Sequence, residues 1–181
     1  MRVLLLTVGL ALLCHRLQAQ GQQASALSGS WYTGAQASNN SAFLRPGGPF
    51  RVYVDTLDII DGNMHAVLLL REDGQCKRVS VTAFKTDVEG EFLLDFRGHS
   101  KLYVVEAEPD SFLVLYKINQ YEGQTSVLAE LLVREPVTQD RILARFGSIC
   151  EELGLSREQI LLLDHKDRCQ ELRTGTPETG N

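Results

Sequence analysis

The chain has 181 residues, of which 44% are hydrophobic and 23% charged, and its 18 basic and 23 acidic residues give a formal net charge of −5. A chain of this length forms one ordinary domain with a substantial core, so it needs neither a structural metal nor a dense disulfide framework, and we expect no cofactor. The excess of negative charge argues against nucleic acid and anionic membrane surfaces as main partners, because it repels phosphate groups.

Residues 1–19 have the pattern of a secretory signal peptide. Arg2 precedes an apolar run over residues 3–13, and the segment ends at the small residue Ala19. The run is much shorter than the ~20 apolar residues of a membrane-spanning helix. We therefore predict cleavage after Ala19 and secretion. The mature chain then keeps 16 basic and 23 acidic residues, a formal charge of −7.

Short apolar runs separated by turn residues fill residues 31–133. This spacing is typical of an antiparallel sandwich or barrel, so the predicted fold class is all-β. Turn sequences such as Asp61-Gly62 and Glu122-Gly123 separate the runs. The long irregular segment 37–49 is expected to be a functional loop, for which a lid is one role. The eight expected strands are Trp31–Gln36, Phe50–Ile59, Met64–Arg71, Lys77–Lys85, Glu91–Phe96, Lys101–Glu106, Phe112–Ile118 and Ser126–Val133.

After Pro136 the hydrophobic period changes to that of a helix. Ile142, Phe146, Ile149 and Leu153 recur at three-to-four spacing, which predicts one amphipathic helix that ends at Gly154. Residues 160–163 are expected to form a short last strand. The tail, residues 173–181, lacks apolar periodicity and is predicted to be disordered, which leaves one barrel domain over residues 20–172.

The alternation of side chains along the strands assigns an inner and an outer face. Phe50, Val52 and Val54 share one face of their strand, and Ala66 and Leu68 align in the next. Several of these positions are small, so an eight-stranded barrel could hold a ligand inside. The pattern by itself fits a fully packed sandwich equally well.

Three cysteines remain after the leader is removed: Cys76, Cys150 and Cys169. In an oxidising compartment an odd count predicts one disulfide with a spare thiol, or an intermolecular pair. Cys150 lies on the apolar side of the expected helix and is expected to be a buried, unreactive thiol.

Two motifs carry a resemblance to a known family. Gly29-Ser30-Trp31 begins the first strand, and Arg134 ends the eighth. The sequence resembles the lipocalins, in particular the branch of major urinary, odorant-binding and salivary proteins, with β-lactoglobulin slightly further away. Supporting matches cover nearly the whole mature chain, for example Gly48–Val54 and residues 145–152, although residues 107–112 lack the family's usual Thr-Asp-Tyr-like turn.

The resemblance implies a fold and a set of structural pairs. The fold is an eight-stranded antiparallel up-and-down barrel with one C-terminal α-helix packed outside. Arg134 is expected to pack over Trp31 and close the narrow end, next to Gly29. Cys76 is expected to pair with Cys169, which leaves Cys150 free.

The resemblance also implies a ligand site inside the barrel. Relatives that bind small pheromones often have a tyrosine where this chain has Leu132. Lys117 follows Leu115 by two residues and shares its face, so its ammonium either extends to solvent at the rim or faces the cavity, where it would pair with a ligand carboxylate. The expected lining residues are Phe50, Val52, Val54, Leu57, Ala66, Leu68, Val81, Leu94, Phe96, Leu102, Leu115, Lys117, Leu128 and Leu132.

The predicted function is a secreted carrier of a small hydrophobic ligand: an odorant, pheromone, fatty acid, steroid or retinoid. The alternative is an interaction or inhibitory protein that uses the barrel as a scaffold. Catalysis is not expected, since residues 28–75 lack the cysteine that a barrel-based prostaglandin synthase uses. We expect a monomer or weak dimer, and a cell-surface receptor could be a further partner. Asn39 begins an N-glycosylation sequon, and the scattered histidines predict no metal site.

Overall fold

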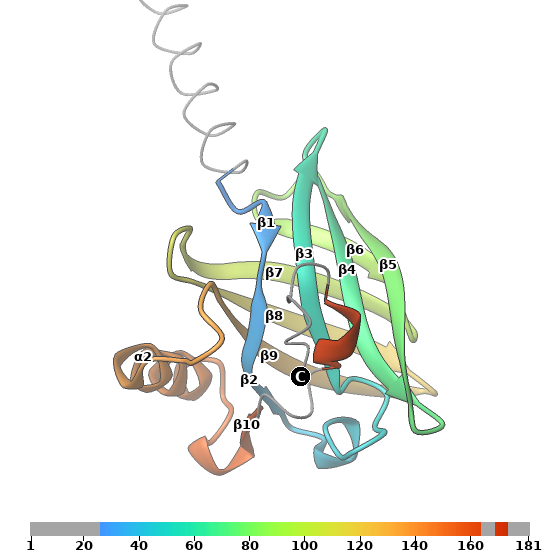
Figure 1. The fold of residues 1–181 in the computed structure, drawn as a ribbon, viewed down its shortest axis with the longest axis vertical. Helices are drawn as coiled ribbons and strands as arrows, with labels where there is room; N and C mark the ends of the chain where they lie inside the picture. The colour runs from blue at the N-terminus through green and yellow to red at the C-terminus, as the bar shows by residue number, and fades with distance from the viewer. Residues whose placement is uncertain (1–25, 164–168, 174–181) are drawn as a thin grey trace, which may run out of the picture.

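The computed structural model describes residues 26–163 and 169–173, so the predicted signal peptide and residues 174–181 of the predicted tail lie outside the described residues. A long antiparallel sheet curls around the core, and one α-helix lies beside it (Figure 1). In the described part of the chain, no helix has the length and apolarity needed to cross a membrane. The strands are β1 (Gly29–Ser30), β2 (Tyr32–Ser38), β3 (Val52–Ile60), β4 (Asn63–Glu72), β5 (Gln75–Lys85), β6 (Glu91–Asp95), β7 (His99–Glu108), β8 (Phe112–Tyr121), β9 (Gln124–Val133) and β10 (Ile160–Leu162); the helices are α2 (Asp140–Glu152) and the 3-10 turns η1 (Ser41–Phe43), η2 (Arg157–Gln159) and η4 (Gln170–Leu172).

The sheet closes into a barrel because its first strand bends between two neighbours. β1 pairs with β3, whereas β2, which follows after Trp31, pairs with β9. At the bend, the Trp31 amide donates to the Asp55 carbonyl at 3.0 Å. From β3 to β9 each strand is antiparallel to the next, so the predicted up-and-down barrel is confirmed. The predicted last strand corresponds to β10, which pairs with the outer edge of β2.

Tight turns fix the register of the hairpins. In Asp61-Gly62, Asp73-Gly74 and Glu122-Gly123 both residues have positive φ, between 50° and 80°. These are the angles of a two-residue hairpin loop whose twist matches that of the strands, and glycine adopts them without steric cost. Three of the predicted turn sequences are therefore hairpin loops.

Strands β8 and β9 bury both faces, one inside the barrel and one beneath α2. Leu113 and Leu115 point into the barrel, whereas Phe112 and Val114 pack outward against the helix. The helix contributes Ile142, Phe146 and Ile149 to this second core, as the sequence period predicts. Its chain turns away after Leu153, where Gly154 has a φ of 80° and the Leu155 amide donates to the Cys150 carbonyl at 2.8 Å.

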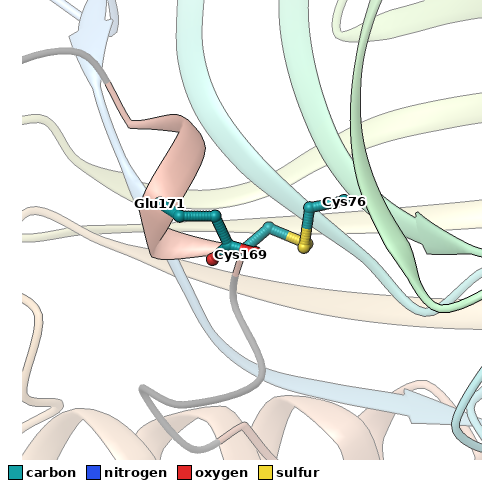
Figure 2. A group of neighbouring side chains, drawn as sticks. All are labelled: Cys76, Cys169 and Glu171. Atoms are coloured by element: carbon teal, nitrogen blue, oxygen red, sulfur yellow. A yellow bond between two sulfur atoms is a disulfide. The ribbon is translucent and has the colours of Figure 1, made fainter.

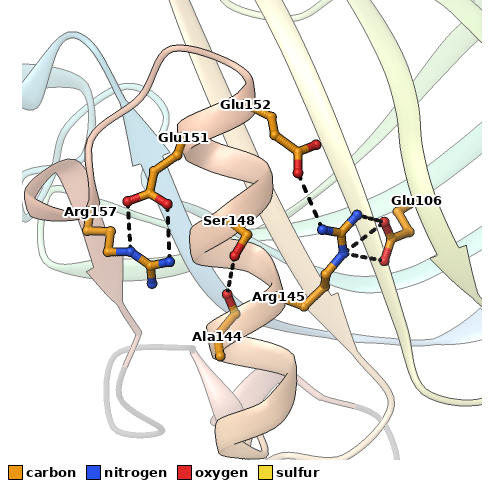
Figure 3. Close-up of polar contacts among 7 residues, drawn as sticks. All are labelled: Glu106, Ala144, Arg145, Ser148, Glu151, Glu152 and Arg157. Carbon is orange, nitrogen blue, oxygen red and sulfur yellow. Dashed lines mark hydrogen bonds and ion pairs between the residues drawn. The ribbon is translucent and has the colours of Figure 1, made fainter.

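Charged side chains on the exposed side of α2 connect the helix to its surroundings (Figure 3). Arg145 donates to Glu106 of β7, with the closest atoms 2.5 Å apart, and lies 3.5 Å from Glu152. Arg157 in η2 forms a two-pronged contact with Glu151 at 2.9 and 3.2 Å. Because these pairs are solvent-exposed, each contributes little stability, and the apolar face holds the helix in place.

A disulfide ties the C-terminal segment to the barrel wall (Figure 2). Cys76 near the start of β5 is bonded to Cys169, immediately before η4, so the pairing implied by the resemblance is confirmed. Glu171 lies close to the two sulfurs, but a disulfide sulfur is not the thiolate that binds a metal. Cys150 is free and buried in the helix core.

Arg173, which the sequence places at the start of the tail, is packed against the barrel. Its side chain is 7% exposed, lies 4.0 Å from the centre of the Tyr32 ring and is 3.7 Å from the buried Asp55 carboxylate. It also donates to the carbonyls of Trp31 and Val54 at 2.8 and 2.7 Å. A cation–π contact and an ion pair therefore hold Arg173 on the barrel wall.

Candidate ligand-binding site

One end of the barrel is closed by a tryptophan and an arginine. The Trp31 ring is fully buried, and the Arg134 guanidinium lies 3.7 Å from the ring centre. Arg134 also donates to four backbone carbonyls, those of residues 26, 28, 30 and 109, at 2.8–3.0 Å. Gly29 has a φ of 112°, and a Cβ there would lie 3.3 Å from the Arg134 side chain. The three predicted closing residues therefore form one contact unit that blocks this end.

Gly29, Trp31 and Arg134 together form the plug of the barrel. Above this plug the barrel contains a mostly apolar cavity of about 60 Å³. That volume is well below the ~300–1,000 Å³ of sites for drug-sized ligands, so the cavity suits a compact molecule. Thirteen of the fourteen predicted residues line it: Phe50, Val52, Val54, Leu57, Ala66, Leu68, Val81, Leu94, Phe96, Leu102, Leu115, Lys117 and Leu128.

Leu132 is the exception among the predicted lining residues. It points inward and is fully buried, but it belongs to the packed core that contains Trp31 and Leu113. Its partners in the sheet are Thr33 on β2 and Leu113 on β8. The period-two pattern gives the correct face, but it does not show that the plug already fills the barrel at this depth.

Five lining residues were not predicted: Gln36, Met64, Ala83, Ala129 and Glu130. Glu130 could have been found, since it lies between Leu128 and Leu132 in a strand whose alternate residues face inward. Gln36 is its direct partner on β2. Hydrophobic patterning passes over these two residues because both are polar.

The long loop of residues 39–51, between β2 and β3, covers the other end of the barrel. Phe43 and Leu44 are buried there with Phe50 and Leu128, both of which line the cavity. The ring centres of Phe43 and Phe50 are 4.8 Å apart, and Tyr121 meets both rings edge-on. The loop is thus placed as a lid would be, and a ligand that enters from this end has to displace its aromatic side chains.

Lys117 lies under this cover rather than at the rim. Its Nζ atom is 4.4 Å from the centre of the fully buried Phe50 ring, a cation–π contact. Burial lowers the pKa of Lys117 to about 8, while the charge of Glu130 acts in the opposite direction. Of the two positions that the sequence left open, the structure has the one that faces the cavity.

Glu130 is the one acidic residue among the described residues that line the cavity. In the register of β8 and β9, Lys117 is opposite Leu128 and Glu130 is opposite Leu115, so the two charged residues are diagonal neighbours on the inner face. Thr33 and Gln36 each donate to Oε1 of Glu130 at 3.2 Å. Burial raises the pKa of Glu130, against the lowering effects of Lys117 and the two donors. The cavity therefore combines apolar walls with one amine and one carboxyl group.

Other candidate residues lie away from the cavity. Asn39 is exposed, and its side-chain oxygen accepts from the Val127 amide at 2.9 Å; its glycosylation stays a prediction. Burial raises the pKa of the Cys150 thiol to about 11, so this thiol is protonated and unreactive at neutral pH. His65 contacts Thr82 and His99 contacts Asp95, both on the barrel surface.

The fold and cavity define a barrel-shaped small-molecule binding protein, and comparison with known proteins gives its family. Residues 28–167 match the model of the lipocalin / cytosolic fatty-acid binding protein family. The chain belongs to the lipocalins. It is 45% identical to minor allergen Can f 2 of Canis lupus familiaris over 176 residues, 94% of this chain and 98% of the relative.

Solved structures agree with this assignment. Possum milk whey lipocalin trichosurin, crystallised with bound 4-ethylphenol, has a TM-score of 0.70 and 30% identity, over 75% of this chain and 97% of the other. A deswapped triple mutant of bovine odorant-binding protein has a TM-score of 0.71 and 32% identity, over 80% and 98% of the two chains.

Proposed function

We propose that the protein is a carrier that holds a small, largely apolar molecule with one polar group inside the barrel. The observation that carries the proposal is the presence of Lys117 and Glu130 in a cavity whose other walls are apolar except for Gln36. Apolar walls contribute about 25 cal/mol per Å² of ligand surface that they bury. The two polar side chains then orient the ligand, because a buried hydroxyl or carboxylate needs a hydrogen-bond partner.

A small phenol is a suitable model ligand. Trichosurin is crystallised with 4-ethylphenol, and the cavity described here is small. A phenol hydroxyl can donate to the Glu130 carboxylate and accept from the Lys117 ammonium. Longer amphiphiles, such as fatty acids, would have to push apart the aromatic side chains of the lid.

Displacement of a fluorescent apolar probe from delipidated protein tests the proposal. We expect 4-ethylphenol to compete about fivefold better than 4-ethyltoluene, which has nearly the same shape but no hydroxyl, since one net hydrogen bond is worth about 1 kcal/mol. The variant Glu130→Gln with Lys117→Met should reduce this preference. Failure of the wild-type protein to take up any probe would refute the carrier function and favour the scaffold alternative.

We also propose that this carrier is secreted and that it binds its ligand without catalysis. The signal-peptide pattern of residues 1–19 and the Cys76–Cys169 disulfide support secretion, because disulfides persist in oxidising compartments. Binding without catalysis is supported by the relatives, whose names describe allergens and odorant-binding proteins. A monomer or weak dimer that delivers its ligand to a cell-surface receptor is the simplest arrangement for such a carrier.

A further inference from the structure

The cavity contains an amine in an environment that is unusual for a lysine. Among the described lining residues, Lys117 is the one that carries an amine, and the remaining walls are apolar apart from Gln36 and Glu130. Although Lys117 and Glu130 face the same space, no ion pair within 4.0 Å joins these two described residues. The amine is thus held against Phe50, and Glu130 is its diagonal neighbour on the inner face of the barrel.

We propose that Lys117 captures small apolar aldehydes as a reversible Schiff base, with Glu130 as the proton donor and acceptor. This inference rests on the proposed function, since the aldehyde has to enter the same cavity before it reacts. A desolvated lysine in a hydrophobic pocket is the usual nucleophile for carbonyl compounds in proteins.

The chemistry needs no reagent beyond the aldehyde. The neutral amine of Lys117 attacks the carbonyl carbon, forms the C–N bond and, after proton transfer from nitrogen to oxygen, gives a carbinolamine. Protonated Glu130 then donates a proton to the carbinolamine hydroxyl, which leaves as water while the nitrogen lone pair forms the C=N bond. The products are a protonated imine on Lys117, a Glu130 carboxylate and one water molecule.

The surroundings of the two side chains favour each stage. With a pKa of about 8, roughly a fifth of the Lys117 amine is neutral at pH 7.4, compared with ~0.1% for a lysine at the ordinary value of 10.5. The hydrogen bonds that Thr33 and Gln36 donate to Glu130 both end on Oε1, so Oε2 can hold the transferable proton. The resulting carboxylate stabilises the cationic imine, and the lid over Phe50 limits access of the water that would hydrolyse it.

Reductive trapping tests this inference on the full mature chain. The protein is incubated with 4-ethylbenzaldehyde, which is close in size to 4-ethylphenol, and cyanoborohydride at pH 7.4, and intact mass and peptide mapping locate the adduct. We expect one main adduct, heavier than the protein by the mass of the aldehyde less one oxygen atom, on Lys117. Labelling should be at least tenfold faster there than on the exposed Lys101, which pairs with Glu91 on the barrel surface.

Matched variants separate the roles of the two residues. Lys117→Met should reduce labelling to the level of the surface lysines, whereas Lys101→Met should leave the main adduct unchanged. Glu130→Gln should slow adduct formation about tenfold, since a positioned acid is worth 10²–10⁴ in rate and the loss of the carboxylate leaves more of the amine neutral.

The outcomes distinguish this inference from the carrier function. Labelling spread evenly over surface lysines, or an unchanged adduct in Lys117→Met, would overturn covalent capture. If 4-ethylbenzyl alcohol and 4-ethylphenol still displace the apolar probe in that case, the carrier function stands without covalent capture. If no compound displaces the probe, both proposals fail.

Discussion

Removal of the Lys117 charge should stabilise the fold at neutral pH, by an amount that follows from how far burial lowers the pKa of this lysine. The relevant comparison is Glu130→Gln against the double variant Glu130→Gln with Lys117→Met, so that the lysine is the single charged group in the described cavity lining. Burial lowers the pKa of Lys117 from 10.5 to about 8 even with Glu130 present. At 1.36 kcal/mol per pH unit, the buried ammonium costs about 3 kcal/mol at pH 7.

The stability difference between the two variants should be largest at low pH and disappear at high pH. Below the folded pKa both states carry the proton, and the full cost is present. Between about pH 8 and 10.5 the unfolded chain binds a proton that the folded chain lacks, so the stability of the lysine-containing protein rises with pH. The methionine variant should therefore be about 3 kcal/mol more stable at pH 7 and nearly equal at pH 10.5.

Urea denaturation of both variants at a series of pH values measures the difference. Groups that the two proteins share, such as Cys150 and the tyrosines, cancel in the comparison. A difference below about 1 kcal/mol at pH 7, or one that does not change with pH, would show that Lys117 reaches water and would refute the reasoning.

Three further predictions concern the frame around the cavity. Arg134→Ala should lower the free energy of unfolding, measured by urea denaturation, by about 2 kcal/mol, because it removes the cation–π contact with Trp31 and hydrogen bonds to four carbonyls. The control Arg141→Ala, on the exposed face of α2, should change the stability little, and equal effects of the two variants would contradict the role of the plug. Cys76→Ser should lower the unfolding free energy by about 4 kcal/mol, since the disulfide closes a loop of 93 residues, and an unchanged denaturation midpoint would argue against this. Ala66→Leu should fill part of the cavity and raise the Kd of an apolar probe at least tenfold while stability is kept, and an unchanged Kd would place the probe elsewhere.

The sequence predicted most of the barrel because each level of its pattern agrees with the fold. Period-two alternation gave the inner face, the Asp-Gly and Glu-Gly pairs gave hairpin turns with positive φ, and the helical period after Pro136 gave α2. Thirteen of the fourteen residues expected to line the cavity do so. These features are local, or follow from motifs such as Gly29-Ser30-Trp31.

The remaining features depend on contacts that local pattern does not encode. Leu132 lies below the cavity because Trp31 fills that depth of the barrel, which is a property of strand stagger. Glu130 was missed because a carboxylate that lines a cavity is rare. The residues that donate hydrogen bonds to it, Thr33 and Gln36, come from a strand almost 100 residues earlier. Arg173 is ordered by Asp55 and Tyr32, which likewise lie far away in sequence.

The central claim is that the apolar cavity holds its ligand with the polar group at Lys117 and Glu130. A crystal structure of the protein with 4-ethylphenol tests it most directly. We predict the ring among the aliphatic side chains between Leu68 and Leu115, and the hydroxyl within hydrogen-bonding distance of the Glu130 carboxyl or the Lys117 amine. An empty cavity, a ligand bound outside the barrel, or a hydroxyl that points away from both side chains would contradict the account.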